Sequence, residues 1–318
     1  MIRRYADFLF LAMLLAALVG LFSVLNDHFW SAQTLNTVAN RIPSLALVAL
    51  GMTFVLMAGA IDLSVGSLSA MSGAVFGSLV VDHGAPLPVA FAAALLSGAA
   101  CGAFNGLLVN WLRMPSFIVT LGLLEGARGL AYLTTGSQTK YLGERLGFLQ
   151  ATLPGAGISV AFLLTVALML VAQGVVTRTV FGRHVVAVGT NEEAARLAGL
   201  SPARVRAIVF ILSGLFAAFG GLCHVSRLGA ADPNAGFGLE LSAIAAAVIG
   251  GTSLLGGRGS MLTTFVGVLI IATLEAGLAH LGVSEPMKRV VTGLVIVGAV
   301  AAEALRTRWM IRKGGQAH

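Results

Sequence analysis

Long apolar stretches dominate the chain, and charged residues occur mainly where these stretches begin and end. No Asp, Glu, Lys or Arg lies between Arg41 and Asp62, between Asp62 and Asp82, or between Arg206 and Arg227. A helix needs about 20 apolar residues to cross the hydrocarbon core of a bilayer, which is close to the length of these intervals. The runs are continuous and lack the two-residue alternation of a membrane β-barrel. The pattern therefore predicts an all-α polytopic membrane protein.

About ten transmembrane helices are expected, in a single transmembrane domain that covers residues 1–318. They are predicted at residues 6–25, 42–60, 65–81, 89–111, 116–135, 158–177, 206–226, 240–255, 260–281 and 289–305. Glycine-rich joints between some of them predict discontinuous helices. The chain has 40 glycines, and many are spaced so that helix backbones could approach closely.

The distribution of basic residues predicts the orientation. With the N-terminus inside, thirteen Lys and Arg residues fall on the inner side and six on the outer side. Because cytoplasmic loops are enriched in Lys and Arg, both termini are predicted to be cytoplasmic. The longest predicted inner stretch then covers about residues 178–206.

Composition excludes several classes of protein. The chain is 57% hydrophobic and only 10% charged, so it cannot cover a soluble globule of 318 residues with polar side chains. Its net charge of +7 does not indicate nucleic-acid binding, because the basic residues form no stripe interleaved with aromatics. The expected surroundings are a lipid bilayer. Cys101 and Cys223 lie in apolar segments without metal or redox spacing.

No catalytic motif is found. The sequence has no Gly-x-x-x-x-Gly-Lys-Ser/Thr phosphate loop, no His-Glu-x-x-His and no nucleophile elbow. We therefore expect no catalytic residue, no metal site and no cofactor bound by this chain itself.

The first polar joint, residues 59–67, contains Asp62 and Ser64 between two apolar runs. Either side chain could accept hydrogen bonds from the first free N–H groups of the following helix. Alternatively, these residues line a translocation pathway or contact a partner.

The second joint, residues 250–260, contains five glycines together with Thr252 and Ser253. Irregular backbone at membrane depth is tolerated only when it is buried in protein or lines a water-filled cavity. Thr252 and Ser253 are therefore candidates for a pathway or gate. A faint match to residues 65–68 leaves an internal duplication open.

The third segment is the inner stretch 178–206. Thr190 and Glu193 have the spacing of a capping box, and a short helix over residues 193–199 should follow. Such a helix is either a docking element for a soluble partner or an inert linker.

Two charges interrupt the predicted span 116–135. Glu125 and Arg128 are three residues apart and could pair on one helix face, or Arg128 could line a pathway and meet solute. Glu275 and His280 are expected either to face a cavity or to lie near the outer interface.

Several segments resemble a known family. Residues 51–67 (GMTFVLMAGAIDLSVGS) are similar to the signature of ribose-type permeases of ATP-binding-cassette importers, with Ala60 in place of a usual glycine. Residues 115–132 and 240–260 resemble two further blocks of that family. Residues 181–199 resemble its cytoplasmic loop, which bears a Glu-Ala-Ala-x-x-x-Gly motif.

The resemblance implies a permease of the bacterial inner membrane that imports a monosaccharide or a related small polar solute. It implies a cytoplasmic ATPase with two fused nucleotide domains, which binds ATP and Mg, and a periplasmic sugar-binding protein. A second copy of the permease or a related permease would complete the assembly. By the same resemblance, the helix that docks on the ATPase contains Glu193, Ala194, Ala195 and Gly199.

Two other classes remain as alternatives. A proton- or ion-coupled secondary transporter would use Asp62, Glu125 and Glu275 as relay carboxylates. A structural or signalling membrane protein would transport nothing.

Overall fold

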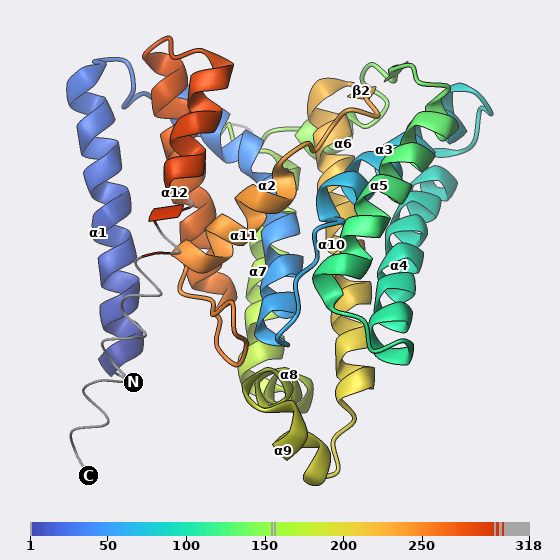
Figure 1. Cartoon of the computed structure of the whole chain (residues 1–318). Helices are drawn as coiled ribbons and strands as arrows, with labels where there is room; N and C mark the ends of the chain where they lie inside the picture. The colour runs from blue at the N-terminus through green and yellow to red at the C-terminus, as the bar shows by residue number, and fades with distance from the viewer. Residues whose placement is uncertain (1, 154, 156, 296, 299–300, 302–318) are drawn as a thin grey trace.

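The computed structural model describes residues 2–153, 155, 157–295, 297–298 and 301. Figure 1 shows a bundle of helices of very different lengths. The elements are α1 (Ile2–Leu25), α2 (Ala32–Met57), α3 (Val65–Val81), α4 (Leu87–Trp111), α5 (Ser116–Thr135), β1 (Lys140–Tyr141), α6 (Gly147–Gln150), α7 (Val160–Arg178), α8 (Val180–Thr190), α9 (Glu192–Leu197), α10 (Pro202–Leu228), β2 (Ala230–Ala231), α11 (Leu239–Ile249) and α12 (Met261–His280). The short strands β1 and β2 pair antiparallel.

Seven of these helices are long and apolar enough to cross a membrane, and α3 and α11 are shorter apolar helices. The all-α polytopic class is confirmed. Nine of the ten predicted spans correspond to one of these helices; residues 285–295 are also helical, and the tenth span, 289–305, lies partly outside the described residues. The total of ten therefore stays a prediction.

The cytoplasmic location of both termini also stays a prediction. The N-terminal end of α1 lies at the end of the bundle that holds α9, which we call the inner end (Figure 1). The opposite end, which holds β2, is called the outer end. The C-terminal residues lie outside the described part of the chain.

Helix α2 begins ten residues before the predicted span. Ser31 caps it by accepting a hydrogen bond from the Thr34 backbone N–H at 3.2 Å. Asn40 in this first part is satisfied within the protein: its side chain donates to the Gly157 carbonyl and accepts from the Ser159 N–H. The apolar pattern therefore predicted only the part of α2 from residue 42 onward, and it missed the more polar first ten residues.

Helices α4 and α10 meet backbone to backbone through the glycines of α4. A Cβ atom at Gly98 would collide with the Gly214 carbonyl oxygen, and one at Gly102 with that of Phe210. At Gly106 it would lie 2.8 Å from the Cα of Ala207. The three glycines are four residues apart, so the predicted close approach of helices is confirmed here.

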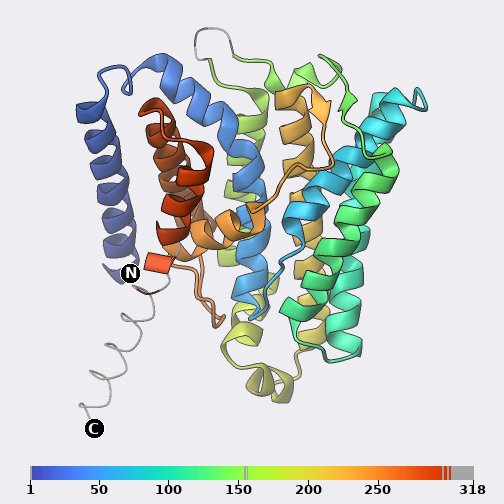
Figure 2. The same ribbon diagram turned by 45° about the horizontal axis from the view of Figure 1, so that its top comes forward.

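Helix α1 stands at the edge of the bundle beside α12 (Figure 2). Near the outer end of α1, Phe22 contacts the bundle: its ring lies 5.4 Å from that of Phe29 and packs over Gly277. Most of its other described side chains are exposed and apolar, as expected for a helix that faces lipid.

Candidate functional site

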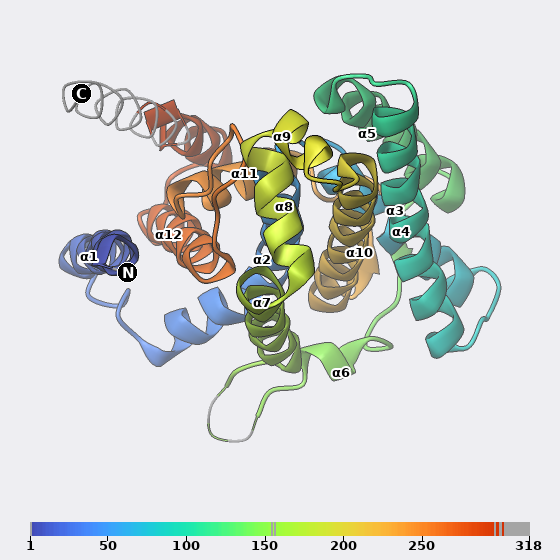
Figure 3. The ribbon, with the colours of Figure 1, turned by 90° about the horizontal axis from the view of Figure 1, so that it is seen from below.

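The inner end of the molecule is formed by α8 and α9. Figure 3, viewed from this end, shows α8 lying across the bundle with α9 beside it. Helix α8 was not predicted, although Phe181, Val185 and Val188 are spaced as one apolar helix face. Thr179 caps it by accepting from the Gly182 N–H at 3.2 Å.

The predicted capping box at α9 is wrong. Thr190 is the last residue of α8, and its hydroxyl donates to the Val186 carbonyl at 2.7 Å. The cap is Asn191, whose Oδ1 accepts from the Ala194 N–H at 2.9 Å. Asn191 is the cap because it lies between the last residue of α8 and the first residue of α9, and its backbone has the extended conformation typical of an N-cap.

The short helix itself is confirmed, and it is held firmly against the bundle. Ala195 is buried in a cluster with valines of α8 and α10. Glu192 pairs with Arg206 of α10. Gly199 ends the helix region with a φ of +83°, a conformation that favours glycine.

The outward face of α9 is exposed. Ala194 is exposed, and Leu197 is 78% exposed at the end of the helix. Glu193 pairs with Arg196 at 2.6 Å, and the hydrogen bond from Arg196 lowers the pKa of the Glu193 carboxyl below its usual value of 4.5. Both side chains therefore remain charged at neutral pH.

Asp62 lies at the centre of a buried polar cluster, and its side chain is 0% exposed. One carboxyl oxygen accepts from the Ser64 hydroxyl at 2.5 Å and the Ser64 N–H at 3.0 Å, and the other accepts from the Ser213 hydroxyl of α10 at 2.8 Å. Asn105 of α4 donates to Ser64 at 3.0 Å. The cluster fastens the irregular 58–64 segment to α4 and α10.

Neither Asp62 nor Ser64 caps α3 in the predicted way. Ser64 occupies the N-cap position without a side-chain cap hydrogen bond. Asp62 accepts from the N–H of Ser64, which precedes the helix, and its other oxygen accepts from the Ser213 hydroxyl. The other alternative, a role in a pathway, stays a prediction.

Arg128 of α5 supports the segment that leads from β2 into α11. Its Nη1 donates to the carbonyl oxygens of Pro233 and Ala235 at 2.5 and 2.7 Å. Its guanidinium lies 4.1 Å from the centre of the Phe237 ring. Irregular backbone within a membrane bundle needs such internal partners.

The predicted pairing of Glu125 with Arg128 is wrong. Arg128 is only 6% exposed and turns to the carbonyls, whereas Glu125 is exposed. The spacing of three residues allows the ion pair. The buried guanidinium instead donates to backbone carbonyls, which supply the polar partners that a charge inside the bundle needs.

The second glycine-rich joint is confirmed as a break between α11 and α12. Ser253 accepts from the Leu255 N–H at 3.2 Å, and its own N–H donates to the Arg258 carbonyl at 3.0 Å. Thr252 is fully buried, with its hydroxyl 3.5 Å from that of Thr264.

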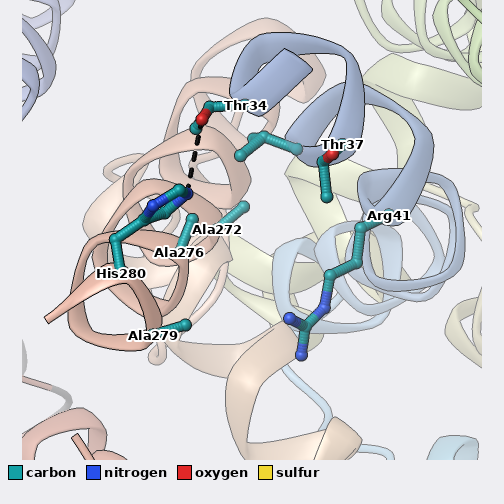
Figure 4. Close-up of a pocket in the computed structure, with 8 residues that line it drawn as sticks. Thr34, Thr37, Arg41, Ala272, Ala276, Ala279 and His280 are labelled. Carbon is teal, nitrogen blue, oxygen red and sulfur yellow. Dashed lines mark hydrogen bonds between the residues drawn. The ribbon is translucent and has the colours of Figure 1, made fainter. Parts of the chain in front are cut away.

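At the outer end, a pocket of about 100 Å³ lies between α2 and α12 (Figure 4). His280 contacts the Thr34 hydroxyl at 3.3 Å on one side, and Arg41 lines the other side. Glu275 forms an ion pair with Arg41 at 3.5 Å. The alternative of an outer location for Glu275 and His280 therefore fits the structure, and His280 also faces a cavity.

The structure brings Asp62 and Ser64 together, and Thr252 and Ser253 together, but Arg128 and α9 are separate from both. Sequence reasoning missed Asn105 and Ser213, which complete the Asp62 cluster. It also missed Phe237, which is 55% exposed beside Arg128.

Known proteins are similar in sequence to most of the chain. The family model described as "Branched-chain amino acid transport system / permease component" matches residues 34–300. The chain is 38% identical over 294 residues to the ribose import permease RbsC of Escherichia coli K12, covering 91% of both chains. It is 40% identical over 286 residues to RbsC of Bacillus subtilis 168, covering 89% of this chain and 88% of that one. It is 36% identical over 295 residues to the D-allose permease AlsC of Escherichia coli K12, covering 92% and 90%.

The apolar helices, together with these matches, define a multi-pass membrane transport protein. The chain belongs to the family of branched-chain amino acid and ribose-type permeases, and it is a permease component of an inner-membrane ATP-binding-cassette importer rather than an enzyme. In this family an ATPase partner binds the nucleotide, and a substrate-binding protein is the other partner.

Proposed function

We propose that this permease imports a monosaccharide of the ribose and allose class. The observation that carries the proposal is the match, over about nine tenths of the chain, to permeases named for ribose and D-allose. The solute choice also depends on the binding protein, so the first test captures the cognate binding protein with its bound sugar. Recovery of an amino acid instead of a sugar would contradict the proposal.

We propose further that α9 is the docking element for a cytoplasmic ATPase with two fused nucleotide domains. Three features support this: α9 is anchored on one side by Ala195, it presents Ala194 and Leu197 on the other, and its ends are fixed by Asn191 and Gly199. A rigid, exposed helix can transmit movement from a partner to the bundle. Glu193 keeps the exposed face charged through its pair with Arg196.

In this proposal, two copies of the permease, or this chain and a related one, enclose the path. The candidates for contact with the passing sugar or for gating are Asp62, Ser64, Arg128, Thr252 and Ser253. Their surroundings support gating more than direct contact, because all five make hydrogen bonds that hold irregular segments in place. Phe237 supplies an exposed aromatic ring next to Arg128, and aromatic rings offer an apolar face to sugars.

The test uses proteoliposomes that contain the permease, its ATPase and its binding protein. Ala194→Arg introduces a long charged side chain on the exposed face of α9 and should abolish ATP-dependent uptake of ribose or allose and copurification of the ATPase. Ala151→Arg, on an exposed alanine next to α6, is the matched control and should do neither. Normal uptake by Ala194→Arg would refute the docking role. Uptake that needs a proton gradient and no ATP would favour the secondary-transporter alternative.

A further inference from the structure

Near its C-terminal end, at Gly189, α8 meets two other segments through backbone atoms. Gly189 of α8 lies against the last residue of α2, and a Cβ atom at Gly189 would collide with the Met57 carbonyl oxygen. The same Cβ would lie 2.7 Å from the backbone nitrogen of Gly257. Three segments that are distant in sequence therefore meet at one point with no side chain between them.

The loop between α11 and α12 completes this contact. The Gly257 N–H donates to the Met57 carbonyl at 2.9 Å. A Cβ at Gly256 would lie 2.5 Å from the Gly189 carbonyl oxygen, and one at Gly257 would collide with the Thr190 hydroxyl. Gly256 and Gly257 have φ angles of +91° and +76°, so both the space and the backbone conformation require glycine.

Such a contact transmits displacement more directly than a contact between side chains. Side chains can change rotamer and absorb a shift, whereas peptide groups in van der Waals contact cannot. The hydrogen bond between Gly257 and Met57 fixes the loop to α2 as well. We call Gly189, Gly256 and Gly257 the glycine joint.

The glycine joint lies between α9 and Thr252 of the 250–260 loop. On one side, Gly189 is separated from the α9 cap Asn191 by a single residue. On the other side, the loop leads to Thr252, which is near Thr264; the Thr264 hydroxyl lies 2.9 Å from that of Thr53 in α2. A movement of α9 therefore reaches the bundle interior through the joint.

We propose that the residues of the glycine joint are positioning residues for transport: they make α9, the end of α2 and the 250–260 loop move as one unit. This inference rests on the proposed docking role of α9. The alternative is that the three glycines serve packing alone and that the loop moves independently of α8.

The first test is Gly189→Ala in the assembled transporter, with Gly174→Ala as the matched control, because nothing lies within 4 Å of the Cβ position at Gly174 of α7. Copurification of the ATPase and its basal ATP hydrolysis should be retained. Stimulation of ATP hydrolysis by the binding protein, and uptake of ribose, should each fall at least tenfold. Wild-type stimulation and uptake in Gly189→Ala would overturn the proposal.

A second test leaves all three glycines of the joint in place. Arg183→Cys in α8 and Leu255→Cys in the 250–260 loop, both at exposed positions, are combined with Cys101→Ser and Cys223→Ala, and each new cysteine carries one spin label. We expect the distance between the two labels, measured by double electron–electron resonance in the assembled transporter, to be the same without nucleotide and with trapped ATP. A distance that changes between these two states in a transporter that still takes up ribose would show that the loop and α8 move independently and would refute the proposal.

These results can be told apart from failure of the docking proposal. If α9 is not the docking element, Ala194→Arg will transport normally whatever the joint variants do. If only the joint inference is wrong, Ala194→Arg will be inactive while Gly189→Ala transports normally.

Discussion

Replacement of Ser213 by alanine tests whether the buried Asp62 cluster stabilises the fold. The Ser213 hydroxyl donates to Asp62 at 2.8 Å, and both side chains are 0% exposed. Ser213→Ala removes one oxygen atom and leaves one carboxyl oxygen of Asp62 without its partner. A buried group left unsatisfied costs about 1–3 kcal/mol, which is about a 5- to 150-fold change in the ratio of folded to unfolded protein.

The assay is thermal or denaturant unfolding of the purified permease in detergent or nanodiscs. Ser23→Ala in α1 is the matched control, because among the described residues its hydroxyl bonds only to the Val19 carbonyl of its own helix, at 2.7 Å. The control should stay close to wild type, while Ser213→Ala should unfold at a clearly lower temperature.

A double-mutant cycle with Asp62→Ala makes the test specific. Ser213 and Asp62 share one hydrogen bond, so the double variant should be less destabilised than the sum of the single ones, by about 0.5–3 kcal/mol. Strictly additive effects, or a Ser213→Ala protein as stable as the Ser23→Ala control, would refute the reasoning that the cluster fastens the 58–64 segment.

Three further predictions concern α5 and α9. Arg128→Lys should lower uptake at least tenfold, because a single ammonium cannot both donate to two carbonyls and cover the Phe237 ring; a transport assay with assembled transporter measures this. Asn191→Ala should destabilise α9 by about 1 kcal/mol and weaken binding-protein-stimulated ATP hydrolysis, with Asn191→Ser restoring it. Since Arg196 lowers the pKa of Glu193, the favourable pairing is present at neutral pH and is lost only as the pH falls through that lowered pKa, below 4.5. ATPase coupling should therefore be unchanged between about pH 6 and 8, and a midpoint in that range would contradict the role of this pair.

The positions of the spans were predictable because a run without charge identifies a bilayer crossing whatever its neighbours are. The start of α2 was not, because Asn40 is satisfied by Gly157 and Ser159, which are more than a hundred residues away in sequence. Helix α8 has the apolar spacing of an amphipathic helix, but it was not predicted because the whole stretch 178–206 was treated as hydrophilic.

The sequence predicted which segments form the candidate site, but it did not predict which side chains contact each other there. The glycines and hydroxyls of 59–67 and 250–260 correctly marked the two places where irregular backbone occurs, although residues 65–67 already belong to α3. The partners of Asp62 could not be inferred, because Ser213 lies 151 residues away in sequence. Local rules also gave the wrong partner for Arg128, since spacing on one helix says nothing about carbonyls that another segment supplies.

The glycine seam between α4 and α10 limits how this protein can change shape. Peptide groups that touch directly cannot slide past each other by a fraction of a residue without steric collision, so these two helices must keep one register throughout a cycle. They form a fixed frame, to which the Asp62 cluster attaches. Opening and closing must then be sought in the elements outside this frame, and substitutions that enlarge Gly98 or Gly102 should prevent assembly of the bundle rather than alter its motion.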